Sequence, residues 1–293
     1  MAMAAALSVS GAPLTSLRER LGRGLFAMVA GPEHQASRSR IHDMPGPRWF
    51  GEDRPIRRVH GDASMFIGGL SALLLQSLHP RAMAAVAAHS GYRGDPWGRL
   101  QRTSTFLAVT TYGRAIDAQR AVDRVRAVHD QVRGTTSSGE PYHANDPHLL
   151  EWVHIAEVYS FLFAHQLYGA RPLDAPECDG YVLDTARVAE ALGVVRPPRD
   201  LDGLTARLTA YRPELRATPE AREAAQFLLL HPPLPWIARP AYAVLAASAV
   251  AALPHWARTP LGLPLLPRAE RTFVRLGGHG LTRSIRWAMA PPR

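Results

Sequence analysis

The sequence DPWGRLQRTSTFLAVTTYG, residues 95–113, carries the signals of an α-helix at both of its ends. Asp95 offers a side-chain acceptor at the N-cap, and Pro96 suits the first turn because its missing N–H would have no partner there. Gly113 provides a stop signal after the last helical residue. We therefore predict a helix over residues 98–112.

This predicted helix presents a face with two arginines and a hydroxyl. Arg99, Arg102 and Thr103 are spaced by three and four residues, which places them on the same side of a helix. Phe106 and Thr110 continue the row. Two interpretations of the arginines are open at this point: an ordinary solvated surface, or groups directed at a bound ligand.

The next segment carries a single histidine on an apolar stripe. Its spacing alternates between four and three residues, which is typical of the buried face of an amphipathic helix. The stripe consists of Ala118, Val122, Val125, His129 and Val132. His129 is therefore expected to face the interior, either as a core histidine bonded to a backbone carbonyl or as a ligand to the iron of a porphyrin.

Several short motifs stand out along the chain in a definite order. They are Gly68-Gly-Leu, Gln76-Ser-Leu-His79-Pro80, His89-Ser-Gly-Tyr, Asp95-Pro-Trp-Gly-Arg99-Leu-Gln-Arg102-Thr103, Val125-Arg-Ala-Val-His129, Tyr142-His-Ala-Asn-Asp146-Pro and Trp152-Val-His154. Together they resemble the MpaB-type oxygenase family, which includes the rubber oxygenases, over about residues 20–265. The resemblance implies an all-α fold with a globin-like core, a non-covalent haem b, and oxygenation or cleavage of unsaturated, often isoprenoid, carbon chains.

The resemblance also implies roles for individual residues. His129 matches the proximal haem ligand, while Arg99 and Thr103 match a haem-pocket arginine and threonine needed for activity. Arg99 would anchor a propionate or polarise bound oxygen, and Thr103 would donate a hydrogen bond to that oxygen. Arg102 stands where the rubber oxygenase has a lysine that can occupy the distal iron position. All 34 basic residues of this chain are arginines, and an arginine that stays protonated is a poor iron ligand. We expect Arg102 to pair with a propionate and the distal side to differ from that of the rubber oxygenase.

The implied pocket has an apolar wall. The stretch Met65–Leu78 is nearly all apolar, and with Phe106, Phe161 and Phe163 it would enclose a hydrophobic alkene in the presence of O2. His154 has two open interpretations, a group of the substrate pocket or a histidine of the core. The haem would carry out the oxygen chemistry, and the protein would position and tune it.

The charge of the chain indicates attraction to acidic surfaces. The net charge is +9 and the isoelectric point is about 10.5. The arginines are scattered, and no zinc-finger, RNA-recognition or basic-zipper motif accompanies them, so nucleic acid is not an expected partner. The lone Cys178 cannot form an internal disulfide. We expect a cytoplasmic bacterial protein, and the sequence specifies no oligomeric state.

No segment has the features of a cleaved signal or a membrane span. Met1–Pro13 is apolar but lacks a charged start. Met65–Leu78 and Ala241–Leu253 are shorter than the roughly 20 apolar residues that a span requires, so both are expected to be core helices. The proline-punctuated apolar run over residues 254–267 suits either peripheral membrane contact or packing on the core.

One domain with extensions is the expected organisation. Residues 1–60 form an N-terminal arm with one helix, over 17–28, and residues 61–293 form a single helical haem-binding domain. Within it, 170–200 is expected to be a loop with a short helical piece at 182–192. No stretch shows the two-residue alternation of a sheet strand. The fold class is therefore expected to be all-α, with additional N- and C-terminal helices around the core.

Other classes of function also fit some of the residues. Glu151-Trp-Val-His154 has the spacing of di-iron bundles, but such a bundle needs two more inward carboxylates and residues 64–90 contain no Asp or Glu. His79, placed before Pro80 at a helix end, is expected to satisfy local backbone groups. A non-catalytic haem sensor or store, or a cofactor-free interaction protein, would share the same helices and charge.

Overall fold

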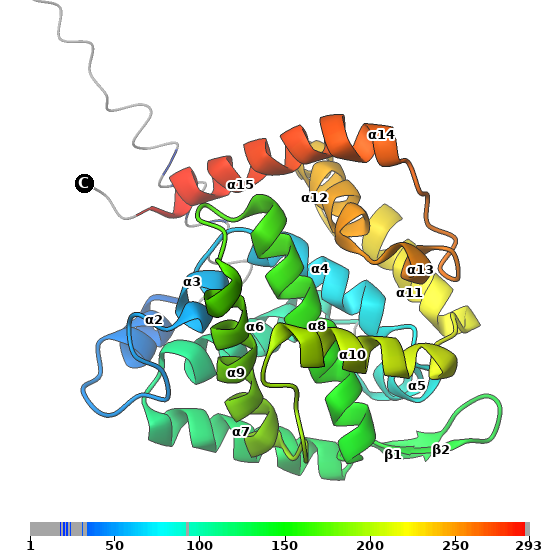
Figure 1. The fold of residues 1–293 in the computed structure, drawn as a ribbon, viewed down its shortest axis with the longest axis horizontal. Coiled ribbons are helices and arrows are strands. Elements are labelled where there is room, and N and C mark those ends of the chain that lie inside the picture. The colour runs from blue at the N-terminus through cyan, green and yellow to red at the C-terminus, as the bar shows by residue number, and fades with distance from the viewer. Residues whose placement is uncertain are drawn as a thin grey trace, which may run out of the picture.

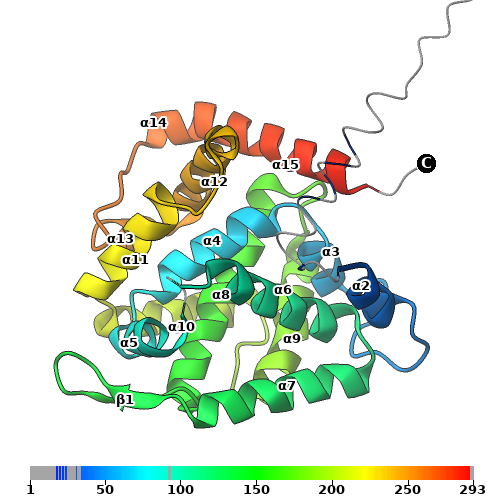
Figure 2. The same ribbon diagram turned by 180° about the vertical axis from the view of Figure 1, so that it is seen from behind.

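The computed structural model describes residues 34–91 and 94–290, together with positions 18, 20, 22, 24 and 31 (Figures 1 and 2). Its elements in chain order are α2 (His34–His42), α3 (Pro55–His60), α4 (Met65–Gln76), α5 (Pro80–His89), α6 (Pro96–Tyr112), α7 (Ala115–Asp130), β1 (Arg133–Thr135), β2 (Pro141–His143), α8 (Pro147–Tyr168), α9 (Ala175–Leu192), α10 (Leu201–Tyr211), the 3-10 turn η1 (Arg212–Glu214), α11 (Pro219–Leu230), the 3-10 turn η2 (Trp236–Ala238), α12 (Arg239–Ala252), α13 (His255–Arg258), α14 (Pro267–Ala269), the π-helical turn η3 (Glu270–Val274) and α15 (Arg275–Met289).

The all-α prediction is confirmed. Within the described residues the strands are those of the short antiparallel pair β1–β2, in which Gly134 lies opposite Tyr142. The sequence analysis missed this hairpin because three-residue strands are too short to show alternation. Of the helix expected over 17–28, the four described positions 18, 20, 22 and 24 are helical, and the others lie outside the described residues.

The core is built around α8, which runs through the centre of the molecule with α4 crossing it (Figures 1 and 2). Trp152 and Ile155 on α8 and Leu75 on α4 are fully buried where the two helices meet. The Trp152 indole N–H donates to the Gln76 carbonyl at 3.1 Å, which satisfies the polar atom of an otherwise apolar side chain. The expectation that Met65–Leu78 forms a core helix is therefore confirmed.

Gly68 allows α4 and α8 to approach closely. A Cβ added at Gly68 would lie 3.0 Å from Phe161 Cδ1 and 3.2 Å from the Ser160 carbonyl oxygen. The neighbouring Gly69 has more room, since its added Cβ would meet only Phe161 Cε1, at 3.9 Å. The missing side chain at position 68 therefore sets how near the two central helices can come.

The segment 170–200 differs from the prediction of a loop with a short helix. Its helix α9 begins at Ala175, seven residues before the expected start, and extends to Leu192. Asp174 accepts from the Glu177 backbone N–H at 2.9 Å, and the Glu177 carboxylate accepts from the Asp174 N–H at 3.1 Å. This reciprocal capping box begins the helix despite the nearby prolines, because a proline in the first turn costs no hydrogen bond.

The N-terminal and C-terminal helices are attached to this core. Ile56 and Val59 of α3, from the segment expected to be an arm, are buried, and α3 packs on α9. At the opposite end of the chain α15 lies across α12 and reaches α8. Arg286 of α15 donates to both Asp62 carboxylate oxygens at 2.9 Å, which connects the C-terminal helix to the residues before α4.

Candidate functional site

Helices α6 and α7 form a hairpin that carries five of the predicted site residues, Arg99, Arg102, Thr103, Phe106 and His129. Asp95 caps α6 by accepting from the Gly98 N–H at 2.8 Å, and α6 ends at Gly113, two residues before α7 begins. The two helices pack against each other and run in opposite directions (Figure 2). Because they are of nearly equal length, Arg99 near the start of α6 lies at the same end of the hairpin as His129 near the end of α7.

The row of residues on α6 passes from buried to exposed along the helix. Thr110 is buried, Phe106 is half-buried, and Arg102 and Thr103 are exposed. The predicted helix is confirmed, with its start two residues earlier than expected. The predicted face is therefore exposed at Arg102 and Thr103, whereas Arg99 is half-buried.

Polar contacts at that end are made within α6. Arg102 forms an ion pair with Asp95 at 3.3 Å, and the Thr103 hydroxyl donates to the Arg99 carbonyl at 3.1 Å. Both contacts involve exposed side chains, so each is worth little in free energy and can be exchanged for another partner. The structure thus gives Arg102 and Thr103 local partners and leaves their ligand-binding roles as predictions.

His129 lies half-buried on α7 with an unused ring nitrogen. Its Nδ1 is buried and has no hydrogen-bond partner among the described residues. Burial lowers the pKa of this histidine, against the opposing effect of the nearby Asn145 amide and Asp130 carboxylate. The ring is therefore neutral at neutral pH, which is the form that binds a metal.

Two titratable side chains of α8 lie inside the helical bundle. Glu157 and His154 are three residues apart and share a helix face. Burial raises the pKa of Glu157 to about 7, although a hydrogen bond with Gln76 and the charge of Arg99 favour the ionised form. Burial lowers the pKa of His154 to about 4, and its Nε2 has no partner in the described part of the chain.

Both of these side chains retain accessible surface. His154 and Glu157 are half-buried by exposed area, although the surrounding protein desolvates them strongly. The charge of Arg99, near the N-terminal end of α6, acts on the Glu157 carboxyl group, so these two side chains lie near each other.

The aromatic residues expected to line the pocket lie in different environments. Phe161 is buried, lies edge-on to the His60 ring with centroids 5.7 Å apart, and packs against Gly68. Phe106 is half-buried on α6. Their contact with a substrate, like that of His154, stays a prediction.

Glu157 and Gln76 were not among the site residues predicted from the sequence. A signal for Glu157 was present, since it is an acidic residue within the largely apolar stretch Ile155–Leu162. Carboxylates are rarely buried without a partner or a function. Gln76 gave no comparable signal, because its role depends on α4 crossing α8, which is a tertiary contact.

The functional class follows from comparison with known proteins. A family model described as "ER-bound oxygenase mpaB/B'/Rubber oxygenase, catalytic domain" matches residues 57–287, which is most of the chain. The chain belongs to this oxygenase family. The matched family model describes an oxygenase catalytic domain. The sequence resemblance to the MpaB-type family is thereby confirmed.

Curated relatives match a shorter part of the chain. An uncharacterized protein of Mycobacterium bovis and one of Mycobacterium tuberculosis are each 36% identical over 123 residues, covering 37% of this chain and 48% of the relative. The matched region thus spans about half the length of each relative. No solved structure matches the chain.

Apolar side chains are exposed around the connection from α11 to α12. Leu230, Trp236 and Ile237 there are more than two-thirds exposed, and Leu266 within the 254–267 run is 58% exposed. In the described part of the chain, the helices are all too short or too polar to cross a bilayer. The expectation of peripheral membrane contact is untested by these observations and stays a prediction.

Proposed function

We propose that this chain is a haem b-dependent oxygenase that acts on an unsaturated hydrophobic substrate, with isoprenoid chains as the leading class. Membership of the oxygenase family supports the reaction type. The observation that carries the haem assignment is His129, a neutral, half-buried imidazole at the end of the α6–α7 hairpin that carries Arg99, whose Nδ1 has no hydrogen-bond partner among the described residues. A histidine that binds iron must be neutral and must have a ring nitrogen free to coordinate the metal.

The arginines of α6 suit the carboxylates of a haem. Arg99 is half-buried at the level of His129, where its guanidinium would bind a propionate in a bidentate manner. Arg102 would bind the second propionate by exchanging its exposed contact with Asp95. Thr103 would turn its hydroxyl from the Arg99 carbonyl toward the bound oxygen substrate. When bound, the haem supplies the activation of O2.

Glu157 suits the movement of a proton in the same pocket. Its pKa of about 7 means that it holds and releases a proton near neutral pH, which is the property of a general acid or base. Gln76 holds the carboxyl group by a side-chain hydrogen bond and so fixes its direction. Phe106, Phe161 and His154, which is neutral at this pH, would form the weakly polar wall for the alkene.

The haem assignment is tested by absorption spectroscopy. Full-length protein reconstituted with hemin should show a Soret band, and His129→Ala should lose it. His143→Ala is the matched control, because this nearby histidine also has a buried ring nitrogen without a partner in the described residues and should not be needed. A protein that stays colourless, or a band lost in His143→Ala instead, contradicts the assignment.

Activity is tested separately on the haem-loaded protein. We expect O2-dependent carbonyl formation from a polyprenyl substrate, with strong losses in Arg99→Ala and Thr103→Ala. A removed active-site hydrogen-bond donor typically costs about 100- to 1,000-fold in rate. Retained haem without turnover on any alkene would favour a sensor or store over an oxygenase.

A further inference from the structure

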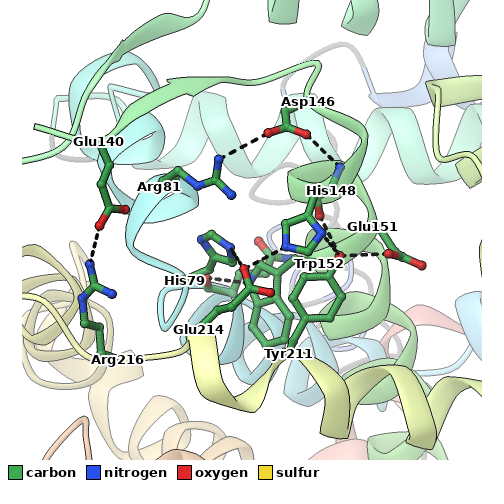
Figure 3. A network of polar contacts seen from close by, with 11 residues as sticks. His79, Arg81, Glu140, Asp146, His148, Glu151, Trp152, Tyr211, Glu214 and Arg216 are labelled. Atoms are coloured by element: carbon green, nitrogen blue, oxygen red, sulfur yellow. Dashed lines mark hydrogen bonds and ion pairs between the residues drawn. The ribbon is translucent and has the colours of Figure 1, made fainter.

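Two histidines and a glutamate from three separate elements meet beside α8 (Figure 3). His79 immediately precedes α5, His148 lies in the first turn of α8, and Glu214 ends η1. One possible ligand atom of each residue lies within 4.8 Å of the others. His148 Nε2 is 2.8 Å from Glu214 Oε2, and His79 Nε2 is 3.6 Å from the same oxygen.

Tyr211 determines which nitrogen of His148 carries a hydrogen. The Tyr211 hydroxyl is 2.9 Å from a carboxylate oxygen of Glu151, the strongest acceptor within its reach, and it donates its single hydrogen there. Its oxygen is then left to accept from His148 Nδ1, at 3.1 Å. A neutral His148 with its hydrogen on Nδ1 has a lone pair on Nε2. This lone pair faces the carboxylate of Glu214, so the pair requires a cation, either an additional proton or a metal ion.

His79 has no hydrogen-bond partner that would explain its burial. The sequence suggested that it bonds local backbone groups, but neither of its ring nitrogens has a hydrogen-bond partner among the described residues, and the residue is only 2% exposed. A buried polar group without a partner costs free energy, because its hydrogen bonds to water are lost without replacement. Trp152 and His148 both pack against the ring, which holds it beside Glu214. A metal ion bound at Nε2 would provide the missing partner.

The spacing of the three groups is close to that of the ligands of a single metal ion. Zinc binds nitrogen and oxygen ligands at about 2.0–2.2 Å, so two of its ligands lie about 3–3.5 Å apart. The two measured separations from Glu214 Oε2 lie on either side of this range. Two histidines and one glutamate are also the protein ligands of many catalytic zinc and non-haem iron sites. The Tyr211 contact to Nδ1 supplies the outer hydrogen bond that orients such a histidine.

The surroundings leave room for a cation and for an exchangeable ligand. A cleft of 330 Å³ opens beside His79 and Glu214. The two arginines that line it are each paired with a carboxylate, Arg81 with Asp146 at 3.5 Å and Arg216 with Glu140 at 3.2 Å (Figure 3). Their charges are therefore partly compensated by neighbouring carboxylates.

We propose that His79, His148 and Glu214 bind one divalent transition-metal ion of the zinc class, with an open coordination position toward the cleft. The site shares no residue with the haem site proposed at His129. It would join the start of α5, the start of α8 and the end of η1 through a single ion.

The test is calorimetric titration of chelator-treated full-length protein with Zn2+. We expect one equivalent to bind, and His79→Gln and Glu214→Gln to lose that binding. Tyr211→Phe should weaken it by about 10- to 100-fold, as losses of outer-sphere hydrogen bonds do. His255→Gln, which removes an exposed histidine on α13, is the matched control and should bind as the parent does. Absence of binding, or unchanged binding in Glu214→Gln, would overturn the proposal and assign His148 and Glu214 to a simple ion pair.

A second measurement separates this site from folding and from the haem. Zn2+ should raise the melting temperature of the parent protein and of His129→Ala, but not that of Glu214→Gln, whose exposed side chain should tolerate the change. Mg2+ should have no effect, since it prefers all-oxygen ligands. Zinc stabilisation that disappears in His129→Ala would place the metal at the other site. Circular dichroism of each variant confirms that its helices are retained.

Discussion

Replacing Gly68 with alanine should destabilise the protein, whereas the same change at Gly69 should not. Both residues lie in α4, one position apart, so they gain the same benefit from alanine in a helix and from a less flexible unfolded chain. That benefit is about 0.5–1 kcal/mol in the free energy of unfolding. The two variants differ in what the new methyl group meets.

Steric contact determines whether alanine at position 68 raises or lowers the stability of the protein. The added carbon would lie 3.0 Å from Phe161 Cδ1, 3.1 Å from Phe161 Cα and 3.2 Å from the Ser160 carbonyl oxygen, and two of these are backbone atoms of α8 that cannot turn aside. Overpacking of a close contact in a core typically costs about 1–3 kcal/mol. At Gly69 the nearest atom is 3.9 Å away, an ordinary contact. We therefore expect Gly69→Ala to be at least 1 kcal/mol, and up to about 3 kcal/mol, more stable than Gly68→Ala.

Thermal unfolding of the two variants and the parent, measured in parallel under the same conditions, tests this expectation. A difference of 1 kcal/mol should move the midpoint by about 2–4 °C in a domain of this size, so the variants should be clearly separated. If Gly68→Ala is as stable as Gly69→Ala, α4 and α8 are not held at the distance described above, and the reasoning fails.

Two further variants test buried charges. Burial raises the pKa of Glu157 from 4.5 to about 7, so the folded state binds more protons than the unfolded state between these values, and stability should fall as pH rises through them. Glu157→Gln should remove this pH dependence. Chemical denaturation of the haem-free variant should give a free energy of unfolding up to about 3 kcal/mol higher than that of the parent above pH 7, but little different at pH 4.5. An unchanged pH dependence would contradict the burial of this carboxyl group. Arg258 is fully buried and paired with Glu270 at 2.7 Å, so Arg258→Met should lower the free energy of unfolding by about 3–5 kcal/mol. Arg199 forms an exposed pair, so Arg199→Met should lower it by less than about 1 kcal/mol. Equal losses of stability in the two arginine variants would show that burial does not determine how much each ion pair contributes to stability.

Local signals in the sequence were sufficient for the helices that carry the predicted site. Asp95, Pro96 and Gly113 mark the ends of α6 within two residues of where they lie, since capping is a property of a few neighbouring residues. The same kind of signal was available for α9, where Asp174 and Glu177 form a capping box, but this part of the chain was predicted to be a loop. Pro176 lies in the first turn of this helix, where a proline favours a helix start.

Tertiary contacts account for what the sequence could not show. His79, His148 and Glu214 are separated by more than sixty positions from one to the next, so their spacing contains no metal-binding pattern. The proton-binding property of Glu157 likewise depends on burial created by the crossing of α4 and α8. Periodicity identifies which face of a helix is buried, but it does not identify which residue of another helix lies opposite.

The attachment of the α6–α7 hairpin has a consequence for the order in which the molecule opens. Helix α6 makes its main contacts with α7, α3 and α2, whereas α4 and α8 make theirs with each other. The hairpin can therefore separate from the central pair while that pair stays intact. In hydrogen-exchange terms, the backbone amides of α6 should exchange through a local opening of lower free energy than the global unfolding that exposes α4 and α8. Such an opening would provide a route by which a large, flat cofactor enters without unfolding the core.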